Sequence, residues 1–156
     1  MLRVVVAAVL ATALLSTAFA ALDVVEHDRS NARVAASVER LRAAAADLDA
    51  RAAPVPPGTE GARRVVRVWL PSRTLGTAPI RYLAVGSGQG QERGPAVRWR
   101  VAGSSERTRH VPGVRVVGRG TGPRGTLVLE RPGTHRLALT LVEQSGRGVV
   151  LVRRLG

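Results

Sequence analysis

Arginine side chains that alternate with apolar residues are the feature of this sequence best suited to recognise a ligand. All 24 basic residues are Arg, and none is Lys. A guanidinium group binds phosphate or carboxylate through two parallel hydrogen bonds, so several of them on one sheet face would attract an acidic glycan, a lipid head group or an acidic protein. The alternative is that these side chains are scattered and solvated. The candidates for anion binding are Arg67, Arg81, Arg98, Arg100, Arg115 and Arg136.

The charge is distributed unevenly along the chain. Residues 21–60 contain five Arg and seven acidic residues, whereas residues 61–156 contain eighteen Arg and four Glu. A strongly basic segment that follows a mildly acidic one indicates an anionic partner or surface. The basic segment has only three aromatic residues, Trp69, Tyr82 and Trp99, and single-stranded nucleic acid is bound largely by stacking on aromatic side chains. We therefore predict no nucleic-acid partner.

No catalytic or metal-binding pattern is present in the sequence. The histidines His27, His110 and His135 lie far apart, and none has a second histidine or a carboxylate at a ligand spacing. No cysteine occurs, which excludes disulfides and thiolate chemistry. The glycine-rich stretches 86–90 and 118–122 match no phosphate-binding motif and open no predicted helix. We predict a protein without enzymatic activity, metal or cofactor.

An apolar run near the start of the chain begins at Val4 and ends at Leu22 (residues 4–22), and only three hydroxyl side chains interrupt it. As an α-helix it would be about 28 Å long, close to the thickness of the hydrocarbon core of a bilayer. Arg3 precedes the run, and Asp23 follows it. Because positive flanks stay in the cytoplasm, we predict a single-pass signal-anchor in residues 1–22, with a cytoplasmic N-terminus and an extracytoplasmic C-terminal domain.

The same run also fits a cleavable signal peptide. Ala18, Phe19 and Ala20 form the small-residue pattern that precedes a cleavage site. Cleavage after Ala20 would release a secreted protein that begins at Ala21. Both interpretations export the C-terminal domain, and they differ in whether it stays attached to the membrane.

Residues 23–53 are predicted to form an amphipathic stem helix. Apolar side chains recur at steps of four and three residues, the spacing of a heptad seam, and the Ala-rich sequence favours a helix. A stripe this narrow needs a surface to cover it, which is either the chain's own β domain or a partner, such as a second copy. The seam consists of Val34, Val38, Leu41, Ala45 and Leu48.

A proline-rich linker, residues 54–60, separates the stem helix from a β domain, residues 61–156. Apolar and polar residues alternate there in short segments bounded by Gly and Pro, and no helix fits between them. We therefore predict an α+β protein, with a helix followed by a small antiparallel β sandwich or barrel. The predicted strands are 62–70, 80–85, 96–102, 107–112 and 114–117 (or one broken strand in place of these two), 126–130, 134–143 and 149–155. The predicted core includes Val97, Trp99, Val101, Leu137, Leu139 and Leu141.

The last predicted hairpin begins with Pro132, Gly133, Thr134 and His135. This sequence resembles the turn that enters the penultimate strand of immunoglobulin-like modules, in which a Tyr usually stands in place of His135. The resemblance implies an immunoglobulin-like sandwich.

Other segments carry a second resemblance. They are Met1-Leu2-Arg3 with the apolar run, the Ala-rich helix, and the stretches 61–66, 82–86, 135–137 and 153–155. Together they resemble a family of unknown function from halophilic archaea, made of short exported or single-pass proteins and associated with type IV pilus or secretion gene clusters. The plan of an apolar helix, an amphipathic stem and a β domain is also similar to that of pilin-like subunits, although no acidic residue lies near the start of the apolar run.

Architecture and resemblance together predict a membrane-anchored extracytoplasmic protein with a structural or assembly role. The resemblance implies an accessory protein of a type IV pilus-like or secretion system. The alternative is an exported binding module that holds an anionic ligand on its arginine-rich sheet face.

Overall fold

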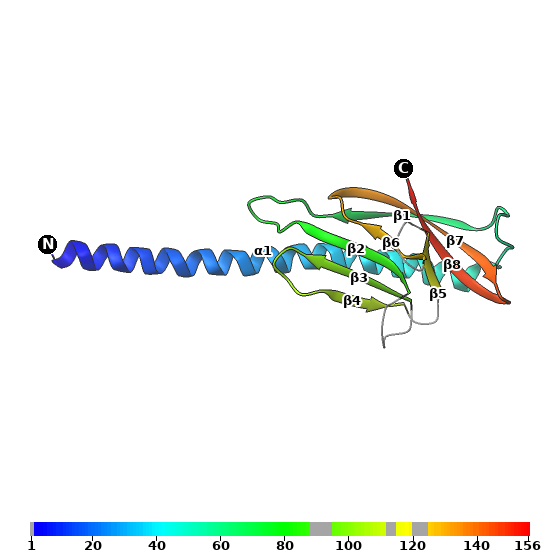
Figure 1. Ribbon diagram of the computed structural model, residues 1–156, viewed down its shortest axis with the longest axis horizontal. Helices are drawn as coiled ribbons and strands as arrows, with labels where there is room; N and C mark the ends of the chain where they lie inside the picture. Colours follow the sequence, from blue (N-terminus) through cyan, green and yellow to red (C-terminus); the bar gives the residue numbers. More distant parts are fainter. Residues whose placement is uncertain (1, 88–94, 112–114, 120–124) are drawn as a thin grey trace.

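The computed structural model describes residues 2–87, 95–111, 115–119 and 125–156, and within them the side chains of residues 2, 3, 15–24, 87, 95 and 115 are left undescribed. In these described residues, a long helix, α1 (Leu2–Arg51), is followed by eight strands that form two sheets (Figure 1). The strands are β1 (Arg63–Leu70), β2 (Ile80–Ser87), β3 (Pro95–Val101), β4 (Arg107–His110), β5 (Arg115–Arg119), β6 (Leu127–Leu129), β7 (Gly133–Gln144) and β8 (Arg147–Leu155). The predicted α+β class with a β sandwich is confirmed.

Helix α1 is continuous over 50 residues, which corresponds to about 75 Å. The apolar run and the stem were predicted as two segments, but no Gly or Pro lies between them and Ala is frequent, so nothing interrupts the hydrogen-bond ladder. The helix ends before Pro54, since proline disfavours helical backbone at the residue before it. In Figure 1 the first part of α1 projects away from the β domain, and the second part lies along it.

The two sheets have the strand orders β1-β7-β8-β5 and β4-β3-β2-β6. The long hairpin β7–β8 forms the centre of the first sheet, and β2 and β3 form the centre of the second. One expectation was wrong: the sheets are not purely antiparallel, because β5 pairs with β8 in parallel. The chain passes from the second sheet at β4 to the first sheet at β5, so the described parts of the predicted segments 107–112 and 114–117 belong to different sheets.

Alternating side chains of the two sheets meet in one core. The six predicted core residues are each at most 1% exposed, which confirms that assignment. The sheets approach closely where β5 faces β2 and β6, because a Cβ atom on Gly118 would overlap the backbone of Val85 and Leu127. Only glycine fits at this position, which explains why a glycine lies inside a strand.

The apolar seam of α1 completes the same core. Its five members are between 0% and 4% exposed, and α1 packs mainly against β1, with further contacts to β3, β7 and β8. The chain's own β domain therefore covers the seam, which is the first of the two predicted arrangements. The helix covers the side of the sandwich next to the edge strand β1. Only a narrow strip of the helix faces the core there, so one apolar residue per turn is enough to fill the contact.

Polar contacts fix where α1 sits on the sandwich. The buried Asn31 side chain accepts a hydrogen bond from Trp99 Nε1 at 3.2 Å and donates one to Ser104 Oγ at 3.4 Å. Further along the helix, Ser37 Oγ accepts a hydrogen bond from the backbone nitrogen of Trp69 in β1 at 3.4 Å. These bonds have defined partners, so they select one register of the helix where apolar packing alone would allow sliding.

Within the described part of the chain, no helix combines the length and the apolar character that a membrane crossing requires. The predicted span 4–22 belongs only partly to the described residues, since the side chains of residues 15–22 are not described. The structure therefore does not confirm the transmembrane part of the predicted fold.

Candidate anion-binding face

Over the residues that the structure describes, the outer face of the sheet β1-β7-β8-β5 carries arginines and no acidic residue. In each of these strands one set of alternate side chains enters the core, and the register places the other set together on the outside. Among the described residues, no Asp or Glu occupies an outward position in these strands. The arginines at outward positions with described side chains, here called the basic face, are Arg63, Arg67, Arg119, Arg136, Arg147 and Arg153.

Four of these arginines form two directly opposed pairs. Arg67 in β1 lies opposite Arg136 in β7, and Arg119 in β5 lies opposite Arg153 in β8. In an antiparallel pair such as β1 and β7, directly opposite Cβ atoms are about 4.5–5.5 Å apart, and like charges at that spacing destabilise the sheet. Within the described residues, no ion pair joins any of the four to a carboxylate. The sheet thus places positive charge close together without neutralising it.

The basic face includes a hollow of about 530 Å³ beside the helix. Arg67 and Arg136 line it together with Arg40 of α1, and Val65 and Val66 contribute an apolar wall. Arg40 is held in place because its Nη2 donates to Ser37 Oγ at 2.9 Å and its Nε to the carbonyl oxygen of Ala36 at 3.4 Å. Three arginines from three elements thus line one hollow, and guanidinium groups bind phosphate and carboxylate.

The six arginines predicted to bind an anion do not share one face. Arg67 and Arg136 lie on the basic face, and the register puts position 115 on the same side, although the side chain of Arg115 is outside the described residues. Arg98 and Arg100 point outward from the other sheet, opposite Ala84 and Tyr82.

The surroundings of that second sheet face are less basic. Arg100 Nε donates to the carbonyl oxygen of Ser104 at 3.2 Å, and the Tyr82 hydroxyl donates to the carboxylate of Glu106 nearby. Arg81 lies at the irregularity between Ile80 and Tyr82 and lines a different hollow, next to α1. The six arginines predicted to bind an anion therefore lie in three separate locations, namely the basic face, the outer face of the other sheet and the hollow lined by Arg81.

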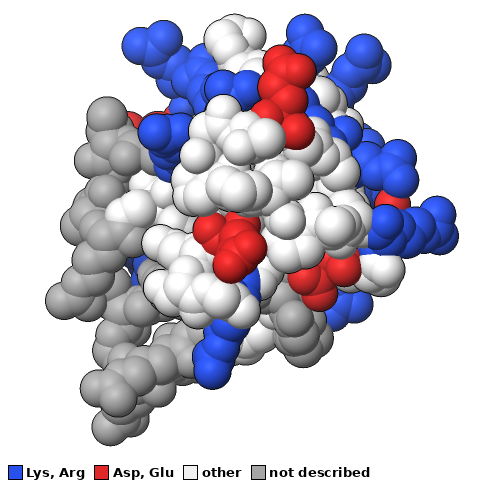
Figure 2. Space-filling model, turned by 90° about the vertical axis from the view of Figure 1, so that its right-hand side faces the viewer, with Lys and Arg blue, Asp and Glu red and all other residues white. Residues whose placement is uncertain are grey.

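Sequence reasoning missed four members of the basic face and the helix residue beside it, namely Arg63, Arg119, Arg147, Arg153 and Arg40. Arg119 was missed because the glycines around it predicted a loop from residue 118, whereas β5 includes it. Arg153 and Arg154 are adjacent, and only the register with β7 shows that Arg153 is the outward one. Figure 2, which views the end of the domain farthest from the N-terminus of α1, shows arginines projecting around the outline and a few acidic side chains among uncharged residues.

The chain matches the model of a domain of unknown function, DUF7311, over residues 1–155. It belongs to this family. No curated protein and no solved structure matches the chain. Because the matched residues include α1 and both sheets, the long helix is part of the DUF7311 domain and not an addition to it.

The histidines of this DUF7311 member lie apart from one another. His135 is buried, and its Nε2 donates to the carbonyl oxygen of Arg131 at 2.7 Å, which fixes the turn before β7. His27 lies on α1 against Gly103, and His110 is in β4. Over the residues that the structure describes, no group of three or more His, Cys, Asp or Glu side chains could hold a metal ion.

Proposed function

We propose that this protein is a membrane-anchored extracytoplasmic structural component, in which the first part of α1 lies in the bilayer and the second part fixes the β sandwich outside. The observation that carries the proposal is that one continuous helix has two different surroundings. Val4 and Leu14 are 74% and 70% exposed, whereas Val34 and Leu41 are 0% and 3% exposed.

The exposed part of α1 is apolar on every side. Val4, Val5 and Val6 are consecutive and all exposed, and consecutive helical residues point about 100° apart. A helix with apolar side chains all round is stable only in apolar surroundings, either a protein interior or a membrane. The β domain does not cover this part of the helix (Figure 1). Arg3 and Asp23 at the ends of the run favour insertion with the N-terminus in the cytoplasm.

The continuous helix would hold the domain close to the membrane surface. Ser30 and Asn31 are the first buried residues of the docked part, eight and nine positions after Leu22. At a rise of 1.5 Å per residue, the sandwich begins about 12 Å beyond the end of the apolar run. A rigid helix without a hinge transmits position and orientation, which suits an assembly component of a surface machine such as a type IV pilus-like or secretion system.

The anchor is tested by extraction of membranes with alkaline carbonate and by N-terminal sequencing of the full chain. We expect the protein to stay in the membrane pellet with its apolar run intact. Leu10→Arg combined with Leu14→Arg should release it, because an arginine near the bilayer centre costs about 2.5–3.5 kcal/mol on insertion scales. Thr59→Arg with Ser145→Arg adds the same charge at exposed positions outside the run and should have no effect. A mature N-terminus at Ala21 would contradict the anchor.

A second candidate function is binding of an acidic polymer or protein on the basic face. The absence of outward acidic residues from the described strands of that sheet favours it. Retention of the detergent-solubilised chain on an immobilised polyanion should fall steeply with salt, because screening shortens the range of the field. Arg67→Glu with Arg136→Glu should elute at lower salt than Arg98→Glu with Arg100→Glu, which changes the charge equally on the other sheet. Equal elution of the two variants would exclude a specific role of the basic face.

A further inference from the structure

The connection between β1 and β2, residues 71–79, is the part of the β domain that reaches farthest toward the N-terminal half of α1 (Figure 1). Arg73 and Thr74 of this connection line a hollow of about 330 Å³ together with Glu26 and His27 of α1. Glu26 follows the last residue of the apolar run, Leu22, by four positions, or about 6 Å along the helix. The connection therefore lies at the level where the proposed anchor would leave the bilayer.

The tip of this connection is a tight turn that hydrogen bonds between its own residues hold in shape. Thr74 N donates to Thr77 O at 3.1 Å, and Thr77 N donates to Thr74 O at 3.4 Å. The two threonine hydroxyl groups are 2.5 Å apart, and Thr77 Oγ1 also donates to the carbonyl oxygen of Ser72 at 2.9 Å. Leu75 and Gly76 are left at the tip of a braced two-residue turn.

Leu75 is 104% exposed, the highest value among the large apolar residues that the structure describes. The central positions of two-residue turns usually carry Gly, Asn or Asp, which suit water and the turn geometry. A single exposed leucine is common on protein surfaces and by itself needs no partner. This one, however, is presented by a braced turn, at the membrane end of the domain, between two exposed arginines, Arg73 and Arg81.

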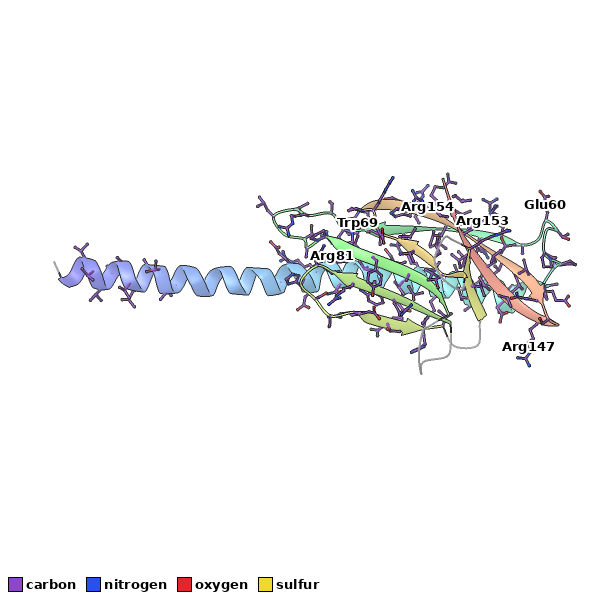
Figure 3. All side chains as sticks on the ribbon, in the orientation of Figure 1. Glu60, Trp69, Arg81, Arg147, Arg153 and Arg154 are labelled. Atoms are coloured by element: carbon purple, nitrogen blue, oxygen red, sulfur yellow. The ribbon has the colours of Figure 1, made fainter. Side chains whose placement is uncertain are left out.

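The charges around the turn favour an anionic surface. Arg73 and Arg81 line the same hollow as Glu26, so the two guanidinium groups exceed the one carboxylate there. Asp28, the next acidic residue on α1, lies 3.9 Å from an Nη2 of Arg107 and is partly offset by it. Figure 3 shows Arg81 at the end of the sandwich nearer the projecting part of α1, and Arg147 at the opposite end.

We propose that the β1–β2 turn is a second membrane contact, in which Leu75 enters the boundary between head groups and acyl chains while Arg73 and Arg81 bind lipid phosphates. The inference rests on the proposed membrane anchor. Glu26, which lines the same hollow as Arg73 and Thr74, lies about 6 Å beyond the end of the apolar run. The head-group layer on each side of the hydrocarbon core is about 5–8 Å thick, so this level falls within it. With two points of contact, the domain could not rotate freely about the axis of α1.

The absence of cysteine from the chain allows a direct test in the full-length protein. Leu75→Cys, Ser145→Cys and Leu14→Cys are each labelled with a nitroxide and reconstituted into vesicles that contain anionic phospholipid. Collisions with oxygen, which concentrates in lipid, are compared with collisions with a water-soluble relaxing agent. Ser145 is the matched control, since it is an exposed residue in the turn between β7 and β8.

We expect the label at position 75 to be shielded from the water-soluble agent and accessible to oxygen, and the label at position 145 to show the reverse. If position 14 lies in the acyl region but position 75 is as exposed to water as position 145, the second contact is refuted and the anchor stands. If position 14 is also in water, the anchor itself fails.

The role of the arginines is tested in the Leu75→Cys background. Arg73→Gln with Arg81→Gln should raise the accessibility of the label to the water-soluble agent, because two phosphate contacts are lost. Arg147→Gln with Arg153→Gln removes the same charge from exposed positions outside the turn and should leave the label buried. Equal behaviour of the two pairs would show that Arg73 and Arg81 do not bind lipid.

Discussion

The two halves of α1 have similar helix-forming sequences and opposite relations to the rest of the molecule. Residues 4–14 are exposed and, apart from Thr12, apolar, whereas residues 30–48 bury one narrow stripe and add polar contacts on its flanks. An apolar stripe flanked by specific hydrogen bonds can dock in one position on a protein surface. A helix that is apolar on all sides requires apolar surroundings but has no preferred docking position. Helix α1 thus changes from a projecting segment to a docked segment without any break in its backbone.

The largest difference is expected from truncation of leucines in the two halves. Leu41→Ala should lower the free energy of unfolding by about 2–5 kcal/mol, because Leu41 is buried and its removal leaves a cavity between α1 and the sandwich. Leu10→Ala, the same change in the projecting half, should leave the unfolding of the β domain unchanged. Denaturant titration in detergent measures both, and equal losses would show that the two halves are not independent.

The polar contact at the start of the docked half gives the next largest effect. Asn31→Ala removes the acceptor of Trp99 Nε1 and leaves a buried donor without a partner, which costs about 1–3 kcal/mol. In a double-mutant cycle, Trp99→Phe should remove most of this cost, since the unpaired donor is then gone. If the loss of stability in the double variant equals the sum of the losses in the two single variants, the hydrogen bond is not the cause.

A comparable effect is expected where the loop after β3 meets the helix. Gly103 has φ +77, and a Cβ atom there would overlap the imidazole of His27. Gly103→Ala should therefore destabilise the domain by about 1–3 kcal/mol through backbone strain and the clash. Adding His27→Ala to this variant removes the clash and should restore part of the lost stability. If no stability is regained, the whole effect comes from backbone strain.

The smallest effect belongs to the ion pairs on the flank of the docked half. Asp47 accepts from Arg64 of β1 at 2.5 Å and from Arg51 at 2.8 Å, and both arginine side chains are more than half exposed. Asp47→Asn should cost about 0.2–1 kcal/mol at low salt, because solvent screens exposed pairs, and less at 1 M salt. Thermal unfolding at two salt concentrations measures this, and a salt-independent loss would indicate packing as its source.

The elements of the fold could be predicted from the sequence because their signals are local. Alternation over three or four residues located β3 and β7 to within one residue at each end, and the prolines after residue 53 predicted the end of α1 to within two. The same alternation identified Trp99 and Leu139 as core. The resemblance to halophilic archaeal and pilus-associated proteins, and the function that it implies, stay predictions.

Only the tertiary structure decided which residues come together. Side-chain alternation shows that Arg67 and Arg136 point the same way within their strands, but their opposition depends on the register between β1 and β7. The parallel pairing of β5 with β8 likewise depends on how the chain crosses between sheets. From the sequence alone, the seam of α1 could pack against a partner or against its own domain. The spacing of its apolar residues predicts that the stripe is buried, but it does not identify the surface that buries it. The contacts of α1 with β1 and β3 show that the chain's own domain covers the seam. These contacts join segments far apart in the sequence, so the pattern within one segment does not predict them.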